Sequence, residues 1–383
     1  MKKSIIIVSQ SLSTGGAERA LVEMVKKLSP ELYNVTILLM DHNGTLHSEV
    51  PEWCNIIMLN EIEQPIKYIF ELIKNAKIIS AIKKILCLLK IKNKDVLEKH
   101  RILARFLPKI KQRFDIAISY FSLYHVIPIY VIDNITACKK ILWVHADVRG
   151  AREEVPKFYG EYFSKYDKIV SVSRIAMEHF DEEYPLLKDK TCVINNILDI
   201  EKIKSMAKTS DIYLNEGLKI CTVGRLEEVK GYYIAIDACE IMTKLGYNFT
   251  WYVCGDGTIK ENLHKKIKEK GLEKQFVLLG TQLNPYKYIE NCDIYCQTSL
   301  REGYCITIAE ARVLNKPIVS TNFECVVEQI TPGVDGIVVE KDPISVANAL
   351  MHLIDNPDER IRLSKNTSFI ENDSVNDLNL LFS

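Results

Sequence analysis

Residues 218–254 read LKICTV GRLEEVKG YYIAIDACEIMTKL GYN FTWYVC, and this stretch decides the fold class. Its two ends, 218–223 and 249–254, are short apolar runs, and the middle run 232–245 has the apolar spacing of a helix. A strand, a helix and a second strand in this order predict two parallel strands joined by a helical crossover. The same alternation continues on both sides, and it predicts an α/β protein with doubly wound, Rossmann-like sheets.

The alternation fills two parts of the chain, which a polar stretch separates. We predict strands at 4–9, 35–40, 56–59, 116–119, 140–144, 169–172, 191–194, 276–279, 294–297, 317–320 and 336–339. The stretch 200–216 has no periodicity and predicts a linker. We therefore expect one domain at 1–199 and another at 217–355, facing each other across a cleft. A helical tail is expected at 356–383, and its return to the first domain is left open.

The composition is that of an ordinary globular protein, but its charge is unevenly distributed. Among 383 residues 47% are hydrophobic and 26% charged, which excludes disordered and collagen-like chains. Lys+Arg and Asp+Glu both number 50, and this neutrality counts against a nucleic-acid binder. Residues 64–113 nevertheless hold 14 Lys or Arg and three acidic residues, an excess of +11 that the remainder offsets with −11.

The basic segment 64–113 also has an amphipathic pattern. Apolar residues stand at positions 69, 70, 73, 78, 82, 85, 86 and 89, and lysines at 67, 74, 77, 83, 84, 90, 92 and 94. This pattern is typical of helices that lie on an anionic bilayer surface. The alternative is that the apolar face packs on the first domain while the lysines are merely solvated. Few aromatic residues interrupt the basic ones, which disfavours a single-stranded nucleic acid as the partner.

Cysteine usage and the N-terminus bear on the compartment. The eleven cysteines form no C-x-x-C pair, so neither a disulfide framework nor a zinc ribbon is indicated. Lys2 and Lys3 precede only four apolar residues, too few for the core of a signal peptide. No apolar run approaches the roughly 18 residues that a membrane span requires. We expect a cytoplasmic protein.

Two motifs that follow predicted strands are suited to phosphate. Gly15 and Gly16 lie between the first strand and the first helix, where free N–H groups and the helix dipole favour an anion. A tight structural turn is the alternative. Arg225 and Lys230 lie five residues apart in the loop that enters the helix at 232–245, and two such cations suit a diphosphate. Their alternative is two solvated surface bases.

The segment REGYCITIAEA, 301–311, holds two carboxylates at the end of a strand and in the next helix. Glu302 would lie in the loop, and Glu310 in the body of the helix. Carboxylates near an anionic ligand are unfavourable unless they accept hydrogen bonds from hydroxyl groups, so this pair suggests sugar recognition. An acidic helix start is an equally ordinary explanation of the segment alone.

Together these motifs resemble those of the family 4 retaining glycosyltransferases with the GT-B fold. The resemblance rests on their order: Gly-Gly-Ala-Glu, Val-Gly-Arg-Leu with a Lys five residues after the Arg, Gly-Asp-Gly, Asn-Pro-Tyr and Glu-x7-Glu. It covers about residues 4–355. The resemblance implies a nucleotide-sugar donor bound mainly by the second domain and an acceptor bound mainly by the first.

The resemblance also implies roles for single residues. Arg225 and Lys230 would neutralise the donor diphosphate, and Glu310 would bind the ribose hydroxyls. Glu302 would contact the donor sugar and the positive charge that develops at its anomeric carbon. His145, in the loop after 140–144, matches the position of a histidine that faces the donor sugar in the family.

Further groups would complete the site. The backbone amides of Gly303, Tyr304 and Cys305 would join the loop carboxylate, and Gly15 and Gly16 would close on the phosphates. Asp147 is a candidate to orient either His145 or the acceptor hydroxyl. For His145 itself, a purely structural role is the alternative.

The resemblance implies that a sugar is transferred from a nucleotide-sugar co-substrate with retention of its anomeric configuration. UDP is favoured because it is the commoner donor nucleotide in the family. The chain has no D-x-D triplet, so we expect neither a metal nor another cofactor. The expected acceptor is a lipid-linked saccharide in polysaccharide assembly, with the enzyme peripheral at the cytoplasmic face of the plasma membrane. The alternatives are a nucleotide-sugar 2-epimerase on the same fold and a non-catalytic partner that binds a nucleotide or a membrane.

Overall fold

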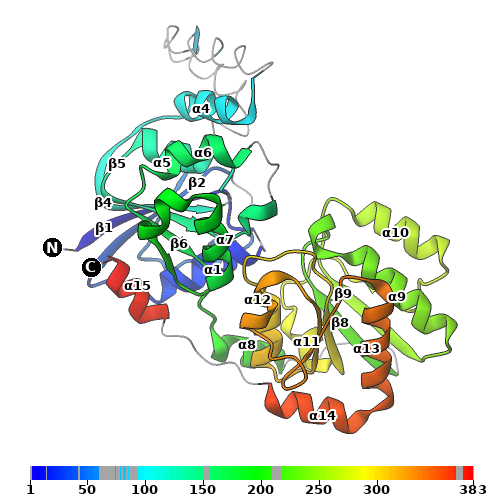
Figure 1. The fold of residues 1–383 in the computed structure, drawn as a ribbon. Coiled ribbons are helices and arrows are strands. Elements are labelled where there is room, and N and C mark those ends of the chain that lie inside the picture. Colours follow the sequence, from blue (N-terminus) through cyan, green and yellow to red (C-terminus); the bar gives the residue numbers. More distant parts are fainter. Residues whose placement is uncertain are drawn as a thin grey trace. The chain divides into compact units, whose positions relative to one another are not determined.

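The structure is a computed structural model of the chain. It describes residues 2–13, 15–41, 44–59, 74, 78, 81, 82, 85, 94–121, 123–150, 155–208, 217–367 and 374–382. The chain forms two compact units, which we call unit 1 (residues 1–197 and 373–383) and unit 2 (residues 198–372). Each unit contains one sheet with helices packed on it (Figure 1).

Unit 1 is built on a parallel sheet of seven described strands. Their bounds are β1 Lys3–Ser9, β2 Tyr33–Leu39, β3 Asn55–Met58, β4 Ile110–Phe121, β5 Ile135–Val144, β6 Lys168–Ser171 and β7 Thr191–Val193. The spatial order is β3-β2-β1-β4-β5-β6-β7. The order reverses between β1 and β4, and ligands of doubly wound sheets bind beyond the carboxyl ends of such a pair.

The helices of unit 1 cover this sheet. They are α1 Gly16–Lys26, α4 Val96–Phe106, α5 Val126–Asn134, α6 Val155–Phe163, α7 Arg174–Glu183 and α15 Ser374–Phe382. The Ser173 side chain caps α7 by accepting a hydrogen bond from the amide of Ala176. Short 3₁₀ helices span His47–Glu49, Val148–Gly150 and Pro185–Lys190.

Unit 2 repeats the architecture with six described strands in the order β10-β9-β8-β11-β12-β13. Their bounds are β8 Leu218–Val223, β9 Phe249–Cys254, β10 Phe276–Leu278, β11 Ile294–Gln297, β12 Ile318–Thr321 and β13 Ile337–Val339. The helices are α8 Ile200–Ala207, α9 Tyr232–Lys244, α10 Lys260–Glu269, α11 Tyr286–Asn291, α12 Ile306–Val313, α13 Pro343–Asp355 and α14 Pro357–Asn366. The parallel arrangement predicted from residues 218–254 is confirmed, since β8 pairs in parallel with β9 along its whole length.

The predicted linker 200–216 is wrong in its first half. Residues 200–207 form α8, which belongs to unit 2 and packs against α11 and α12. Asp199 caps this helix through the amide of Lys202, and Ile203 is buried. The helix has only 8 residues, so its apolar pattern is too short to be recognised within a polar stretch of sequence. Residues 209–216 lie outside the described part of the chain.

The last helix, α15, belongs to unit 1, whereas α13 and α14 belong to unit 2. The side chain of Phe382 is fully buried, and its ring packs nearly perpendicular to the Tyr33 ring, with 6.0 Å between the ring centroids. The ammonium groups of Lys3 and Lys139 donate hydrogen bonds to the carbonyl groups of Phe382 and Leu381. Cations at the carboxyl end of a helix oppose its dipole favourably and satisfy carbonyl groups that lack helical partners.

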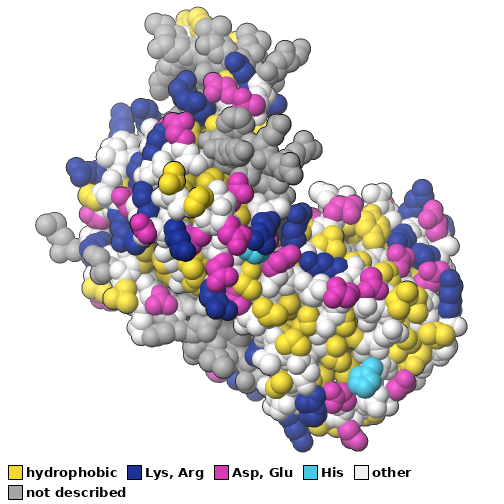
Figure 2. All heavy atoms as spheres, in the orientation of Figure 1, with side chains coloured by type: hydrophobic (Ala, Val, Ile, Leu, Met, Phe, Trp, Pro, Cys, Tyr) yellow, Lys and Arg dark blue, Asp and Glu magenta, His cyan; other side chains and the backbone are white. Residues whose placement is uncertain are grey.

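Much of the basic segment 64–113 falls outside the described residues. Within its described part, the side chains of Ile78, Ile82 and Ile85 are exposed. The helix α4 buries Ile102 and Phe106, and Figure 2 shows both basic and acidic side chains over this helix. No helix in the described ranges is long and apolar enough to cross a membrane.

Candidate functional site

Two loops meet at the point where the strand order of unit 2 reverses. One loop follows β8 and the other follows β11, and these two strands are neighbours. The amide of Leu300 donates to the carbonyl of Val229 at 2.8 Å, and the Thr298 hydroxyl donates to the carbonyl of Lys230 at 3.1 Å. The backbone of each loop therefore fixes the other.

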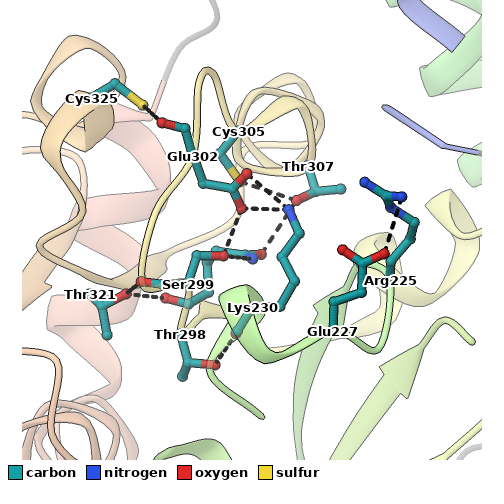
Figure 3. A network of polar contacts seen from close by, with 12 residues as sticks. Arg225, Glu227, Lys230, Thr298, Ser299, Glu302, Cys305, Thr307, Thr321 and Cys325 are labelled. Atoms are coloured by element: carbon teal, nitrogen blue, oxygen red, sulfur yellow. Dashed lines mark hydrogen bonds and ion pairs between the residues drawn. The ribbon is translucent and has the colours of Figure 1, made fainter. Parts of the chain in front are cut away.

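Lys230 and Glu302 form an ion pair across these loops. The Lys230 Nζ atom lies 2.7 Å from Glu302 Oε1 and 2.9 Å from Oε2. Both side chains are mostly buried, with exposed fractions of 18% and 10%. Burial lowers the pKa of Lys230, the carboxylate of Glu302 raises it, and the net direction is upward. The lysine therefore stays charged, and Figure 3 shows the two charged groups pointing at each other.

Gly231 allows the two loops to approach this closely. Its φ is +66°, a conformation that residues with a Cβ rarely adopt. A Cβ atom at this position would lie 1.9 Å from the carbonyl oxygen of Thr298. Gly271, at the end of α10, has a φ of +65° but open space around it.

Gly231→Ala is expected to lower the free energy of unfolding by about 2–5 kcal/mol, because the clash with Thr298 adds to the backbone strain. Gly271→Ala carries the same strain without the clash and should cost about 1–2 kcal/mol. Urea denaturation of both variants measures the difference. Equal losses would contradict the close contact between the loops.

Arg225 lies in the same loop as Lys230, and its side chain is 63% exposed. Its guanidinium lies 3.1 Å from Glu227, and its charge lowers the pKa of Lys230, after the larger effects of burial and Glu302. Figure 3 shows Arg225 beside Lys230 and turned toward Glu227. The structure thus brings together both predicted cations and one of the two predicted carboxylates.

Glu310 occupies a separate position inside α12. It is only 3% exposed, and Oε1 accepts a hydrogen bond from the Tyr286 hydroxyl at 3.1 Å. The helix begins at Ile306, and no side chain caps it. The amides of Tyr304 and Cys305 donate to no other residue that the structure describes. These amides are therefore placed beside the Glu302 loop with their hydrogen-bonding capacity unused.

Sequence reasoning missed two groups that hold Glu302. The Ser299 hydroxyl donates to Oε1 at 2.6 Å, and the Cys325 thiol donates to the carbonyl oxygen of Glu302 at 3.3 Å. Ser299 lies three residues before Glu302 and could have been suspected from its place after a strand. Cys325 lies beyond β12, and nothing in the sequence connects it with this loop.

The remaining predicted residues belong to unit 1. Gly15 precedes α1, and Gly16 is its first residue. The carboxylate of Glu18 folds back on this turn, since a Cβ atom on Gly15 would lie 2.1 Å from Oε2. Ser13 donates to the other oxygen of Glu18 at 3.2 Å. The helix start that was expected to hold phosphate thus already faces a carboxylate.

His145 follows β5, and its ring packs at a steep angle to the Tyr120 ring, with 4.3 Å between the ring centroids. Its Nε2 atom is buried and has no hydrogen-bond partner among the described residues. Asp147 does not orient this histidine, contrary to one of the two roles considered for it. Its Oδ1 atom instead lies 2.9 Å from Nδ1 of His179, a residue of α7 that sequence reasoning did not single out.

Burial lowers the pKa of His145 to about 3. In the unfolded chain its pKa is near 6.5, so the unfolded state binds the proton first. The stability that the neutral ring contributes is complete above about pH 6.5 and is lost as the pH falls toward 3. As the pH falls between these values, the free energy of unfolding of the wild type should decrease by about 1.4 kcal/mol more per pH unit than that of His145→Gln. Urea denaturation at about pH 7 and pH 5 tests this, and parallel losses would contradict it.

No group of three or more His, Cys, Asp or Glu side chains within the described ranges is arranged to hold a metal ion. The ten described cysteines all carry free thiols.

Comparison with known sequences finds one family match, which covers most of unit 2. Residues 187–368 match a family described as "Glycosyl transferases group 1". An uncharacterized glycosyltransferase of Haemophilus influenzae is 24% identical over 97% of this chain and 96% of its own. One from Methanocaldococcus jannaschii is 28% identical over 58% of this chain and 57% of its own.

A Campylobacter jejuni protein is 29% identical over 42% of this chain and 43% of its own length. Its name describes a 4-alpha-N-acetylgalactosaminyltransferase whose acceptor is a diphospho-undecaprenol saccharide. The matched segments thus span about half the length of the Methanocaldococcus and Campylobacter relatives.

Solved structures share the fold over the whole chain. HepE of Anabaena, crystallised with UDP and glucose, has a TM-score of 0.74 at 16% identity and covers 99% of both chains. TarM of Staphylococcus aureus, in complex with UDP among other ligands, has a TM-score of 0.70 at 13% identity and covers all of both chains. At these identities the likeness concerns the fold alone.

Proposed function

We propose that this chain is a group 1 glycosyl transferase of the GT-B type, which moves a sugar from a nucleotide diphosphate to a saccharide hydroxyl. UDP is the proposed nucleotide, and the sugar is transferred with retention. The ion pair of Lys230 with Glu302, beside Arg225, is the observation that carries this proposal.

The charges of this site match those that develop during transfer. As the bond between the anomeric carbon and the diphosphate breaks, negative charge grows on the phosphate and positive charge on the sugar. Lys230 and Arg225 would stabilise the first, and Glu302 the second. Because two cations, Arg225 and Lys230, lie in one loop, we propose that the reaction needs neither a metal ion nor a cofactor besides the nucleotide sugar.

Retention follows if the acceptor hydroxyl attacks the face that the diphosphate leaves. A bond forms between the acceptor oxygen and the anomeric carbon, and the departing phosphate oxygen takes the acceptor proton. Glu302 is unsuited to be the base, because its carboxylate already accepts hydrogen bonds from Lys230 and Ser299. Its role is therefore electrostatic.

We propose a lipid-linked saccharide of cell-surface polysaccharide assembly as the acceptor. The name of the Campylobacter relative specifies such an acceptor, and an Erwinia amylovora relative is named for amylovoran biosynthesis. The enzyme would then work at the cytoplasmic face of the plasma membrane.

The membrane contact would use the basic segment 64–113, whose described residues Ile78, Ile82 and Ile85 are exposed. We expect the protein to sediment with vesicles that contain anionic lipid and to be released by high salt. Vesicles of neutral lipid serve as the control. Equal binding to both kinds of vesicle, or none to either, would contradict this contact.

The activity itself is tested by incubating the protein with each of a panel of UDP- and GDP-sugars, with EDTA present throughout. Slow donor hydrolysis to the free nucleotide, and its acceleration by a lipid-linked saccharide, are expected. Release of a 2-epimerised sugar would instead identify the epimerase alternative. Thermal stabilisation by a nucleotide without turnover of any donor would identify a non-catalytic binding protein.

A further inference from the structure

A chain of hydrogen bonds runs from the interior of unit 2 to Glu302. The Tyr295 hydroxyl donates to Gln297 Oε1 at 3.0 Å, and Gln297 Nε2 donates to the Ser299 hydroxyl at 2.8 Å. Ser299 in turn donates to Glu302 Oε1 at 2.6 Å. Tyr295, Gln297 and Ser299 are at most 1% exposed, so water does not compete for these bonds.

The direction of every bond in this chain is determined. Burial raises the pKa of Tyr295, so its hydroxyl keeps the proton and donates it. Gln297 Oε1 also accepts from the Thr307 hydroxyl at 3.3 Å, which leaves the amide nitrogen to face Ser299. Since Ser299 accepts from this nitrogen, its single proton points to Glu302.

The two oxygens of Glu302 are therefore not equivalent. Oε1 accepts two hydrogen bonds, from Lys230 and Ser299, whereas Oε2 accepts one, from Lys230, among the residues that the structure describes. A carboxylate oxygen can accept about two such bonds. One acceptor position is left on Oε2, and the side chain is 10% exposed.

We propose that Ser299 and Gln297 are positioning residues that turn Glu302 so that Oε2 presents this remaining acceptor position to the donor sugar. This inference rests on the proposed function. It assigns the sugar contact to one oxygen, and it predicts that Ser299 and Gln297 act on the reaction only through Glu302.

A purely structural role predicts something different. The turn after β11 is also held by the Thr321 hydroxyl, which donates to the carbonyl of Ser299 at 2.6 Å. Ser299→Ala leaves this bond in place. If the Ser299 hydroxyl served only to stabilise the turn, its loss would lower stability without altering turnover by the folded enzyme.

The test is a double-mutant cycle of kcat and of KM for the donor. Ser299→Ala and Gln297→Glu are each expected to lower kcat by about 10- to 100-fold, with a smaller change in KM. In the Glu302→Gln background, Ser299→Ala should change kcat less than about twofold, because the group through which it acts is already altered. Equal losses in both backgrounds would overturn the proposal.

Thr222→Val is the matched control for buried hydrogen bonds. The Thr222 hydroxyl donates to the carbonyl of Cys296 at 2.6 Å and accepts from Trp251 Nε1 at 2.9 Å, and its side chain is fully buried. This variant should lower the melting temperature at least as much as Ser299→Ala but leave kcat unchanged. A fall in kcat as large as that of Ser299→Ala would show that the assay reports loss of stability, which would contradict the inference.

A crystal structure of the ligand-free Ser299→Ala variant tests the same inference without turnover. Glu302 is expected to rotate about its side-chain torsions while it stays paired with Lys230, because the Ser299 hydroxyl no longer fixes Oε1. An unchanged carboxylate would overturn the inference. A wild-type enzyme that turns over no nucleotide sugar would refute the proposed function instead, while this structure would still decide the role of Ser299.

Discussion

Lys230→Met is expected to lower the kcat of glycosyl transfer by about 10²- to 10³-fold. Methionine fills similar space but removes the charge that would stabilise the departing diphosphate. The variant also leaves the Glu302 carboxylate mostly buried without its counter-charge, so the free energy of unfolding should fall as well. Single-turnover transfer and urea denaturation measure the two effects separately.

Lys244→Met is the control for this prediction. Lys244 pairs with Glu240 on α9, and its side chain is 72% exposed. Exposed pairs of this kind contribute little to stability, so both kcat and stability should remain close to wild type. Turnover by the Lys230 variant at more than half the wild-type rate would show that another group stabilises the leaving phosphate.

Glu302→Gln is expected to reduce kcat by about 10²-fold, while the dissociation constant for UDP alone changes little. Glutamine preserves the shape of the side chain but cannot stabilise positive charge at the anomeric carbon. Its amide can also turn an N–H group toward the ammonium of Lys230, which lies within 2.9 Å of both carboxylate oxygens. Transfer kinetics and calorimetric titration with UDP test the two halves of the prediction.

Glu359→Gln changes a partly exposed carboxylate of the same unit that pairs with Arg362 within α14. It should affect neither turnover nor UDP binding. If Glu302→Gln weakened UDP binding as strongly as it lowered kcat, Glu302 would contact the nucleotide rather than the sugar.

The sequence predicts the strands of unit 2 well because each is a short apolar run bounded by turns. The strands predicted at 218–223, 249–254 and 294–297 have the same bounds in the structure. The order of the strands in the sheet cannot be predicted in this way. β8 and β11 are neighbours although β9 and β10 lie between them in the chain, and no local pattern encodes this adjacency.

The same limit applies to the site. Lys230 and Glu302 were each predicted from local motifs, but their ion pair joins residues 72 positions apart and depends on strand order. The contact of Asp147 with His179 likewise depends on how α7 packs beside the loop after β5. Glu18 was quoted within a motif, yet the return of its side chain onto Gly15 is a matter of rotamer, which residue types do not specify.

The placement of α15 bears on how the protein can be dissected. Unit 2 is one uninterrupted stretch of chain, whereas unit 1 draws its final helix from beyond unit 2. A gene fragment that ends near residue 197 would therefore expose the apolar surface that Phe382 covers and would leave Lys3 and Lys139 without their carbonyl partners. Expression of unit 1 alone therefore requires a circularly permuted or fused design that restores residues 374–382. Unit 2 can be expressed as one continuous fragment, residues 198–372.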